Sequence, residues 1–381
     1  MWQKVFDTID SLADEYLLIW KEFCDIESPT SYKEGVDKAS RYMVALAEKM
    51  GWQVEYNRQS VSGDCVCITM NPGAPGRPVA MSGHVDTVHP VGSFGNPATR
   101  IEGDKIFGPG VVDCKGGVVA SFLAMAALQQ CGFQDRPIIN LLQSDEEISS
   151  ITSNKQTVAY MGEKAKNCAV FMNTEGCAPG TLTIERKGIQ RYVFDIRGRA
   201  VHSSECYEGI NPVTEAAHKI LALEQFKDPE GITCNCSVIQ GGTTPNTVPD
   251  SCSFLADFRY RTMAQRDYIE QFVRDLAAKS FVEGSVCTVT EKSRRICMER
   301  TDFNEELLCN ICNIYEKTGL PAVKGVFGKG GSDAADMTAR GIPCLDGFGV
   351  YGKRVHSVEE YAYIDSLAQA AKAMAAITLY L

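Results

Sequence analysis

The order of helix-like and strand-like segments constrains the fold of this chain most strongly. Apolar residues have helical spacing at residues 6–23, 36–50 and about 117–130. Short apolar runs bounded by polar or turn residues, which suit buried strands, lie at residues 78–82, 137–142 and 168–172. Strands that alternate with helices predict an α/β sheet.

The middle of the chain has a different pattern. Strand-like segments lie at residues 190–197, 234–240, 251–258 and 285–290, and helical segments at residues 212–225 and 264–278. This β-α-β-β-α-β order is typical of a ferredoxin-like α+β domain. A helix at 305–317, a strand at 342–348 and a helix at 364–380 then return to the α/β pattern.

The two patterns predict a discontinuous domain with an insertion. Residues 1–185 and 295–381 would form the α/β domain, and residues 186–294 the inserted α+β domain. The length of 381 residues agrees with two domains, since one domain commonly takes roughly 100–200 residues.

Composition excludes several classes of protein. A net charge of −10 disfavours nucleic-acid binding, which needs a basic face. The acidic N-terminal segment is unlike a signal peptide, and the most apolar stretch, residues 116–128, is too short to span a bilayer. The 16 cysteines then suit free thiols in a reducing compartment. We therefore expect a cytoplasmic protein without membrane or nucleic-acid partners.

Two histidines and three carboxylates stand out because each follows a strand-like run or the loop after it. They are His84, Asp113, Glu147, Glu175 and His356. Some of these residues have simpler explanations. His84 and Asp86 could be an ordinary loop pair, Asp113 could cap the following helix, and residues 145–147 could start a solvated helix.

Their joint placement favours a metal site. Open α/β sheets place their sites at the edge where the strands end. Histidine and carboxylate ligands without cysteine suit two divalent ions bridged by a carboxylate. Asp86 could accept the second ring N–H of His84 and fix its tautomer. Glu146, beside a ligand, could accept a proton from the attacking water.

Several longer motifs contain these residues. They are Ser-Gly-His84-Val-Asp86-Thr-Val, Gly-Pro-Gly-Val-Val-Asp113-Cys-Lys-Gly-Gly, Ser-Asp-Glu146-Glu147, Asn-Thr-Glu175-Gly, Gly-Arg-Ala-Val-His202-Ser-Ser and Gly330-Gly331-Ser332-Asp333-Ala334. Over essentially its whole length, the chain resembles the co-catalytic zinc metallopeptidases. That family includes aminoacylase, succinyl-diaminopimelate desuccinylase, acetylornithine deacetylase and bacterial glutamate carboxypeptidase.

The resemblance implies a zinc-peptidase-like catalytic domain with a central mixed sheet and an inserted ferredoxin-like domain through which the protein forms a homodimer. It also implies two Zn²⁺ ions per subunit, for which Co²⁺ or Mn²⁺ may substitute. Asp113 would bridge both ions, with His84 and Glu175 on one and Glu147 and His356 on the other. The peptide bond after Asp113 is expected to be cis.

Roles for further residues follow from the same resemblance. Glu146 would be the general base, and Asp86 would orient His84. His202 would reach the partner subunit's site and stabilise the oxyanion. Asn246 and Arg259 match substrate-binding positions, and Gly331 would line the same pocket.

The resemblance extends to activity, namely hydrolysis of an amide bond in a small peptide or an N-acyl amino acid. The segments around Asp113, Arg259 and Gly331 are most similar to the glutamate carboxypeptidase branch, which predicts an exopeptidase. An N-acyl amino acid deacylase of the acetylornithine or succinyl-diaminopimelate type is the alternative. A non-catalytic binding protein of the same fold is a remote one, since no proposed ligand is missing. Cys114 departs from the residue that relatives often carry there.

Overall fold

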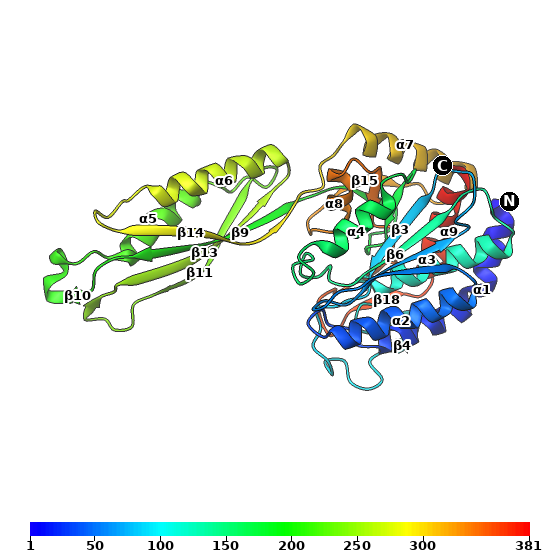
Figure 1. Ribbon diagram of the computed structural model, residues 1–381, viewed down its shortest axis with the longest axis horizontal. Coiled ribbons are helices and arrows are strands. Elements are labelled where there is room, and N and C mark those ends of the chain that lie inside the picture. Colours follow the sequence, from blue (N-terminus) through cyan, green and yellow to red (C-terminus); the bar gives the residue numbers. More distant parts are fainter. The chain divides into compact units, whose positions relative to one another are not determined.

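The structure is a computed structural model that describes residues 1–381 and divides into two compact units (Figure 1). The first unit comprises residues 1–184, 300–327 and 332–381. The second comprises residues 185–299 and the short segment 328–331. The inserted domain expected at residues 186–294 lies within the second unit.

The first unit is built on an eight-stranded sheet with the order β1-β2-β6-β3-β7-β16-β8-β15. Its strands are β1 (Gln53–Asn57), β2 (Cys65–Met70), β3 (Val79–His84), β6 (Ile138–Gln143), β7 (Phe171–Asn173), β8 (Thr181–Arg186), β15 (Lys324–Gly328) and β16 (Cys344–Asp346). Strand β3 pairs in parallel with β6 and β7, and β2 pairs antiparallel with β6. The sheet is therefore mixed, and the predicted α/β class is confirmed.

Helices cover this sheet. They are α1 (Trp2–Asp25), α2 (Lys33–Lys49), α3 (Lys115–Gln130), α4 (Gln156–Ala165), α7 (Asp302–Thr318), α8 (Ala334–Ala339) and α9 (Ser366–Tyr380). Helix α3 is apolar around nearly its whole circumference, as expected for a helix buried on all sides, and it packs against α1, α9 and β3. All six residues of β3 are buried, so both faces of the sheet are covered there.

A second, smaller sheet in the first unit has the order β17-β18-β5-β4. Its strands are β4 (Arg100–Glu102), β5 (Lys105–Phe107), β17 (Gly352–Lys353) and β18 (Tyr361–Tyr363). Strand β5 pairs with β18, which joins the segment before residue 113 to the segment after residue 356. The sequence did not predict these strands, which are only two or three residues long.

The second unit has a four-stranded antiparallel sheet with the order β11-β13-β9-β14. Its elements are β9 (Gly188–Arg197), β10 (Val201–His202), η1 (Ser203–Glu208), α5 (Pro212–Leu223), β11 (Thr233–Gly241), β12 (Thr247–Val248), β13 (Ser251–Tyr260), α6 (Met263–Ala278) and β14 (Val286–Arg295). Alternate residues of β9 and β13 are buried beneath α5 and α6. The predicted ferredoxin-like pattern is confirmed.

Some predicted bounds differ from the structure. The strand expected at residues 342–348 is limited to Cys344–Asp346, because Gly347 adopts a φ of 87° that ends the strand. The last strand of the second unit continues to Arg295, beyond the expected residue 290. None of the helices combines the length and the apolar character that crossing a membrane requires.

Candidate metal centre

Three of the candidate ligands follow the ends of neighbouring parallel strands. His84 is the last residue of β3. Glu147 follows β6, and Glu175 follows β7, each within a few residues of the strand end. Because β6 and β7 pair with β3 from its two sides, these side chains meet at one edge of the sheet.

The smaller sheet positions the other two candidate ligands. Strand β5 leads into the loop that carries Asp113, and the β17–β18 hairpin carries His356. Pairing of β5 with β18 holds these loops side by side. The backbone φ of His356 is 62°, in the left-handed region that residues other than glycine seldom adopt.

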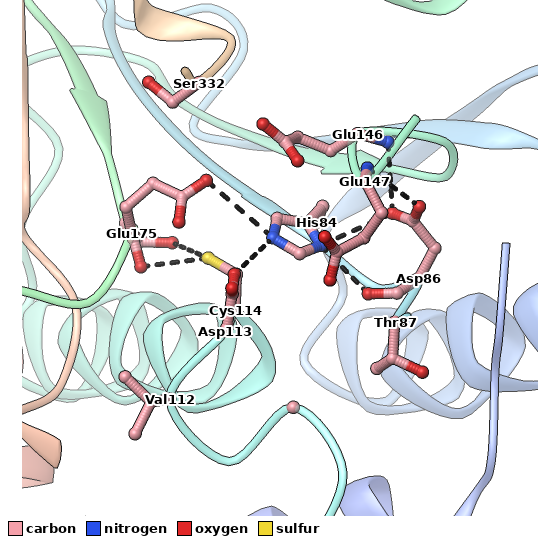
Figure 2. Close-up of polar contacts among 12 residues, drawn as sticks. His84, Asp86, Thr87, Val112, Asp113, Cys114, Glu146, Glu147, Glu175 and Ser332 are labelled. Atoms are coloured by element: carbon pink, nitrogen blue, oxygen red, sulfur yellow. Dashed lines mark hydrogen bonds and ion pairs between the residues drawn. The ribbon is translucent and has the colours of Figure 1, made fainter. Parts of the chain in front are cut away.

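Asp113 lies at the centre of the cluster. Its Oδ1 is 2.9 Å from Nε2 of His84, and its Oδ2 is 3.1 Å from Nε2 of His356. Glu175 Oε1 is 3.7 Å from His84 Nε2, and Glu147 Oε2 is 3.3 Å from His356 Nε2. Each oxygen of one carboxylate thus faces a different histidine, and each histidine has a second carboxylate of its own. Figure 2 shows the His84 half of this arrangement, in which Asp113 and Glu175 both contact the ring.

The electrostatics of the cluster suit a bound cation. Burial raises the pKa of Glu147 to about 7. Burial, followed by repulsion from Asp113 and Glu146, raises the pKa of Glu175 well above its usual value. Burial also opposes ionisation of Asp113, but hydrogen bonds from His356 and His84 outweigh it and lower its pKa. Crowded carboxylates of this kind are stabilised in their charged form by a divalent ion.

The donor set therefore fits divalent metal ions. Two groups of three potential ligand atoms lie within 4.8 Å of one another, namely His84, Asp113 and Glu147, and His84, Cys114 and Glu175. In the second group, burial raises the pKa of Cys114, and its thiol donates to the Thr174 carbonyl at 3.0 Å. A protonated thiol that is engaged in this way is not a metal ligand. The remaining donors are imidazole nitrogens and carboxylate oxygens.

Two simpler explanations of the acidic residues are wrong. Helix α3 begins at Lys115 with Cys114 at the N-cap, so Asp113 does not cap it. Residues 145–147 lie in turns, and α4 begins only at Gln156. Asp145 points elsewhere, since its carboxylate accepts hydrogen bonds from the Ser153 amide and the Thr157 hydroxyl.

Asp86 orients more than one residue of the site. Nδ1 of His84 lies 2.9 Å from the backbone oxygen of Asp86 and 3.4 Å from its carboxylate, so the carbonyl is the nearer acceptor. The expected contact with the carboxylate is therefore present, but it is the longer of the two. The carboxylate also accepts from the Thr30 hydroxyl at 2.7 Å and from the amides of Glu146 and Glu147, both at 3.2 Å. It thereby ties the turn after β6 to the His84 loop.

Glu146 is buried beside the ligand cluster. Its carboxylate extends toward Glu175, and its charge contributes to the raised pKa of that residue (Figure 2). Glu146 is therefore close to the cluster without being one of the residues grouped around Asp113.

Glycines allow the Asp113 loop to form. Gly110 has a φ of 74°, in the region that favours glycine. A Cβ on Gly117 would lie 2.0 Å from the backbone oxygen of Thr174, so only glycine lets α3 approach the strand end so closely. The expected cis peptide bond between Asp113 and Cys114 is present.

Sequence reasoning missed Glu360. This residue is 1% exposed, and its carboxylate accepts from the amides of Val112 at 2.8 Å, Asp113 at 3.1 Å and Gly110 at 3.3 Å. Nε2 of His89 lies 3.3 Å from the same group. Glu360 thus holds the backbone of the Asp113 loop. A glutamate four residues after His356 was the only signal in the sequence.

Replacing Glu360 with alanine is expected to weaken metal binding about 10- to 100-fold, the usual effect of losing a group that orients a ligand. Zinc competition with a fluorescent chelator measures this. Glu359→Ala is the matched control, because Glu359 is exposed and pairs only with Arg354 at the surface. Equal zinc affinity in the two variants would show that Glu360 does not position Asp113.

Four of the predicted residues belong to the second unit: His202, Asn246, Arg259 and Gly331. His202 and Asn246 are exposed. Nδ1 of His202 accepts from the Ser204 amide at 3.3 Å, which in the neutral ring leaves the proton on Nε2. A Cβ on Gly331 would lie 2.2 Å from Cδ of Arg295, so the Arg295 side chain packs directly against this glycine.

Arg259 and Arg191 share one carboxylate. Arg259 donates to Asp257 from Nε at 2.7 Å and from Nη2 at 3.3 Å, and Arg191 donates to it from Nε at 2.6 Å. Two guanidinium groups and one carboxylate leave an excess positive charge, which suits an anionic ligand.

Comparison with known proteins agrees with this site. The model of "Peptidase family M20/M25/M40" matches residues 80–380, well over half of the chain. The chain belongs to this family. The predicted resemblance is thereby confirmed, and the protein is a metal-dependent hydrolase that acts on amide bonds.

Individual members of the M20/M25/M40 family align over most of the chain. Carboxypeptidase G2 of a Pseudomonas species is 26% identical, covering 91% of this chain and 83% of its own. A succinyl-diaminopimelate desuccinylase of a Bradyrhizobium species is 25% identical over an alignment that covers 79% of this chain and 82% of its own.

Solved structures share the fold. The aminopeptidase PepT of Bacillus cereus superposes with a TM-score of 0.79 at 19% identity, covering 96% of this chain and 97% of its own. The YXEP protein of Bacillus subtilis, described as a dinuclear metal binding peptidase, has a TM-score of 0.72 at 15% identity. The superposition covers 97% of this chain and 99% of that protein.

Proposed function

We propose that the protein is a zinc-dependent exopeptidase of the glutamate carboxypeptidase type, which releases a C-terminal amino acid from a small peptide. The observation that carries this proposal is the placement of Asp113 between two histidines, each with its own second carboxylate. One zinc ion would be held by His84, Asp113 and Glu175, and the other by His356, Asp113 and Glu147. Oxygen and nitrogen donors of this kind suit Zn²⁺ and accept Co²⁺ or Mn²⁺ as substitutes.

When bound, such a pair of ions polarises a carbonyl and lowers the pKa of water. Glu146 would take the proton of the attacking water and later give it to the leaving amine. Asp86 would keep the His84 ring and the Glu146–Glu147 turn in fixed positions relative to each other. Burial of these groups would exclude bulk water from the reacting atoms.

We propose that His202 stabilises the oxyanion. Its support is the hydrogen bond that Nδ1 accepts from the Ser204 amide, because this leaves Nε2–H free to donate to developing negative charge. Following the family resemblance, His202 would act in the partner subunit's site. Mixing His202→Ala with Glu146→Ala subunits should then restore activity in mixed dimers.

The homodimer is part of the same proposal. Strand β11 is at the edge of the second unit's sheet, and Val238 and Ile239 on it are about half exposed. An open edge strand with apolar side chains can pair with a second copy. A cytoplasmic location is also proposed, supported by 16 cysteines of which none forms a disulfide.

Arg259 would bind the substrate carboxylate, with Asn246 and Gly331 lining the same pocket. Replacing Arg259 with methionine is expected to raise KM about 10- to 100-fold, because a hydrogen bond to a charged group contributes about 1.5–3 kcal/mol. The effect should be confined to substrates with a free carboxylate, and C-terminal amides should react poorly with both proteins. Arg274→Met, on the exposed surface of α6, is the control. An unchanged KM for free acids would contradict this role of Arg259.

A deacylase would use the same metal ligands as the exopeptidase. It would differ in the acyl group that is cleaved from the amino acid, which would be acetyl or succinyl rather than a peptide residue. A panel of N-blocked dipeptides, N-acetyl amino acids and N-succinyl amino acids, assayed with added zinc, separates the two. Faster release of the C-terminal amino acid from the N-blocked dipeptides supports the exopeptidase proposal. Faster release of the acyl group from N-acetylornithine or N-succinyl-diaminopimelate would show that the protein is a deacylase.

A further inference from the structure

The first unit contains a cavity that the hydrolase mechanism does not use. Its volume is about 530 Å³, within the range of roughly 300–1,000 Å³ that is usual for small-molecule sites. The N-terminal turns of α1, the end of α7, strand β8 and helix α9 surround it. No member of the metal cluster lines it.

The wall of the cavity is mainly apolar. Trp2 and Phe6 contribute from α1, Leu182 from β8 and Phe348 from the segment after β16. Gly349 in that segment donates its amide to the backbone oxygen of Glu175 at 3.0 Å. The cavity therefore lies against the backbone that carries a metal ligand, but it is formed by different side chains.

Most polar side chains at the wall already have partners. Lys372 pairs with Asp10 at 2.7 Å, and Gln369 donates to Asp365 at 3.0 Å. The Thr318 hydroxyl donates to the Ile314 carbonyl at 2.7 Å. Since its one cation is neutralised, the cavity offers no unpaired charge to an ionic ligand.

Two tyrosine hydroxyls remain. Tyr315 is 5% exposed and Tyr351 is half-buried, and the hydrogen bonds that these two residues form use their backbone atoms. Burial is the main cause that raises the pKa of Tyr315, and the neighbouring Tyr351 and Cys177 raise it further. Burial likewise raises the pKa of Tyr351 to about 12. Both hydroxyls are therefore protonated at neutral pH and can donate a hydrogen bond to a bound molecule.

We propose that this cavity binds an uncharged, largely apolar molecule with a carbonyl or similar hydrogen-bond acceptor, which receives hydrogen bonds from Tyr315 and Tyr351. The apolar wall would supply the burial energy, and the two hydroxyls would fix the orientation of the ligand. The inference does not depend on the substrate of the metal centre.

The neutral aryl ketone Prodan (6-propionyl-2-dimethylaminonaphthalene) tests the proposal, because its fluorescence reports both an apolar environment and hydrogen bonding to its carbonyl. With the full-length, metal-loaded protein, we expect saturable binding of one Prodan per chain. Trp2 lines the cavity, so energy transfer from tryptophan to bound Prodan should fall in Trp2→Phe while binding persists.

Two variants make the test specific. Ala373→Phe, which fills the cavity from α9, should abolish binding. Tyr315→Phe removes only the hydroxyl and should weaken binding about three- to tenfold, the effect of one neutral hydrogen bond. Tyr32→Phe, at an exposed tyrosine outside the cavity, should change nothing. The proposal would be overturned if the wild type showed no saturable binding of Prodan. It would also be overturned if Ala373→Phe or Tyr315→Phe unfolded at the wild-type temperature and bound Prodan with wild-type affinity.

Discussion

Glu146→Gln is expected to lower kcat about 10²- to 10⁴-fold, the usual contribution of a general base. Glutamine has nearly the same shape as glutamate but cannot accept the proton of the attacking water. Glu146 is not among the four candidate ligands grouped around Asp113, so the metal content should remain that of the wild type. Steady-state kinetics together with metal analysis of the purified variant measure both expectations.

The neighbouring residue provides the matched control. Glu147→Gln makes the same chemical change one position later, in a side chain 3.3 Å from His356 Nε2. We expect this variant to bind zinc more weakly and to recover activity when zinc is added in excess. Glu146→Gln should gain nothing from added zinc. Wild-type turnover in Glu146→Gln would refute its role as the base.

Lys219→Met is expected to destabilise the second unit by about 3–5 kcal/mol, the usual cost of removing one partner of a buried ion pair. Lys219 and Glu215 are both fully buried on α5, with 3.0 Å between Nζ and Oε1. Lys219 also donates to the backbone oxygens of Leu276 and Lys279, both at 2.6 Å. Without the lysine, the Glu215 charge would remain buried and these carbonyls would lose their donor. Urea unfolding followed by circular dichroism measures the loss.

An exposed pair in the same unit is the control. Arg274 and Glu270 are 3.0 Å apart on α6, and Arg274→Met should cost less than about 1 kcal/mol. A similar small loss in Lys219→Met would show that the buried pair is not structurally important.

The buried pair also predicts a dependence of stability on pH. Burial opposes ionisation of Glu215, but the amides of Val282 and Phe281 and the Lys219 ammonium outweigh it and lower its pKa. The resulting stabilisation is present above the unfolded pKa of about 4.3 and is lost as the pH falls through the lower folded value. The difference between wild type and Lys219→Met should therefore shrink under acid conditions.

The sequence was sufficient to predict that the candidate ligands lie together, because strand ends determine their positions. His84, Glu147 and Glu175 follow short runs of apolar residues that suit buried strands, and the structure forms strands there. Parallel pairing then brings their side chains to one edge of the sheet. The ferredoxin-like unit was equally visible, because alternating burial along β9 and β13 follows alternating apolar residues.

Other features could not be predicted from local patterns. Strands β5 and β18 are too short for periodicity, yet their pairing places His356 beside Asp113. Glu360 acts on backbone amides nearly 250 residues earlier in the chain, so no spacing rule reveals it. The nearer acceptor for His84 is likewise a backbone carbonyl, which the sequence Gly-His-Val-Asp cannot indicate.

The most direct test of the account is a titration of the metal-free protein with zinc, in which bound metal and hydrolysis of an N-blocked dipeptide are measured together. The account predicts binding of two zinc ions per chain, recovery of activity as the sites fill, and loss of both in Asp113→Ala. Full hydrolysis by the metal-free protein, or two zinc ions bound as tightly by Asp113→Ala as by the wild type, would contradict it.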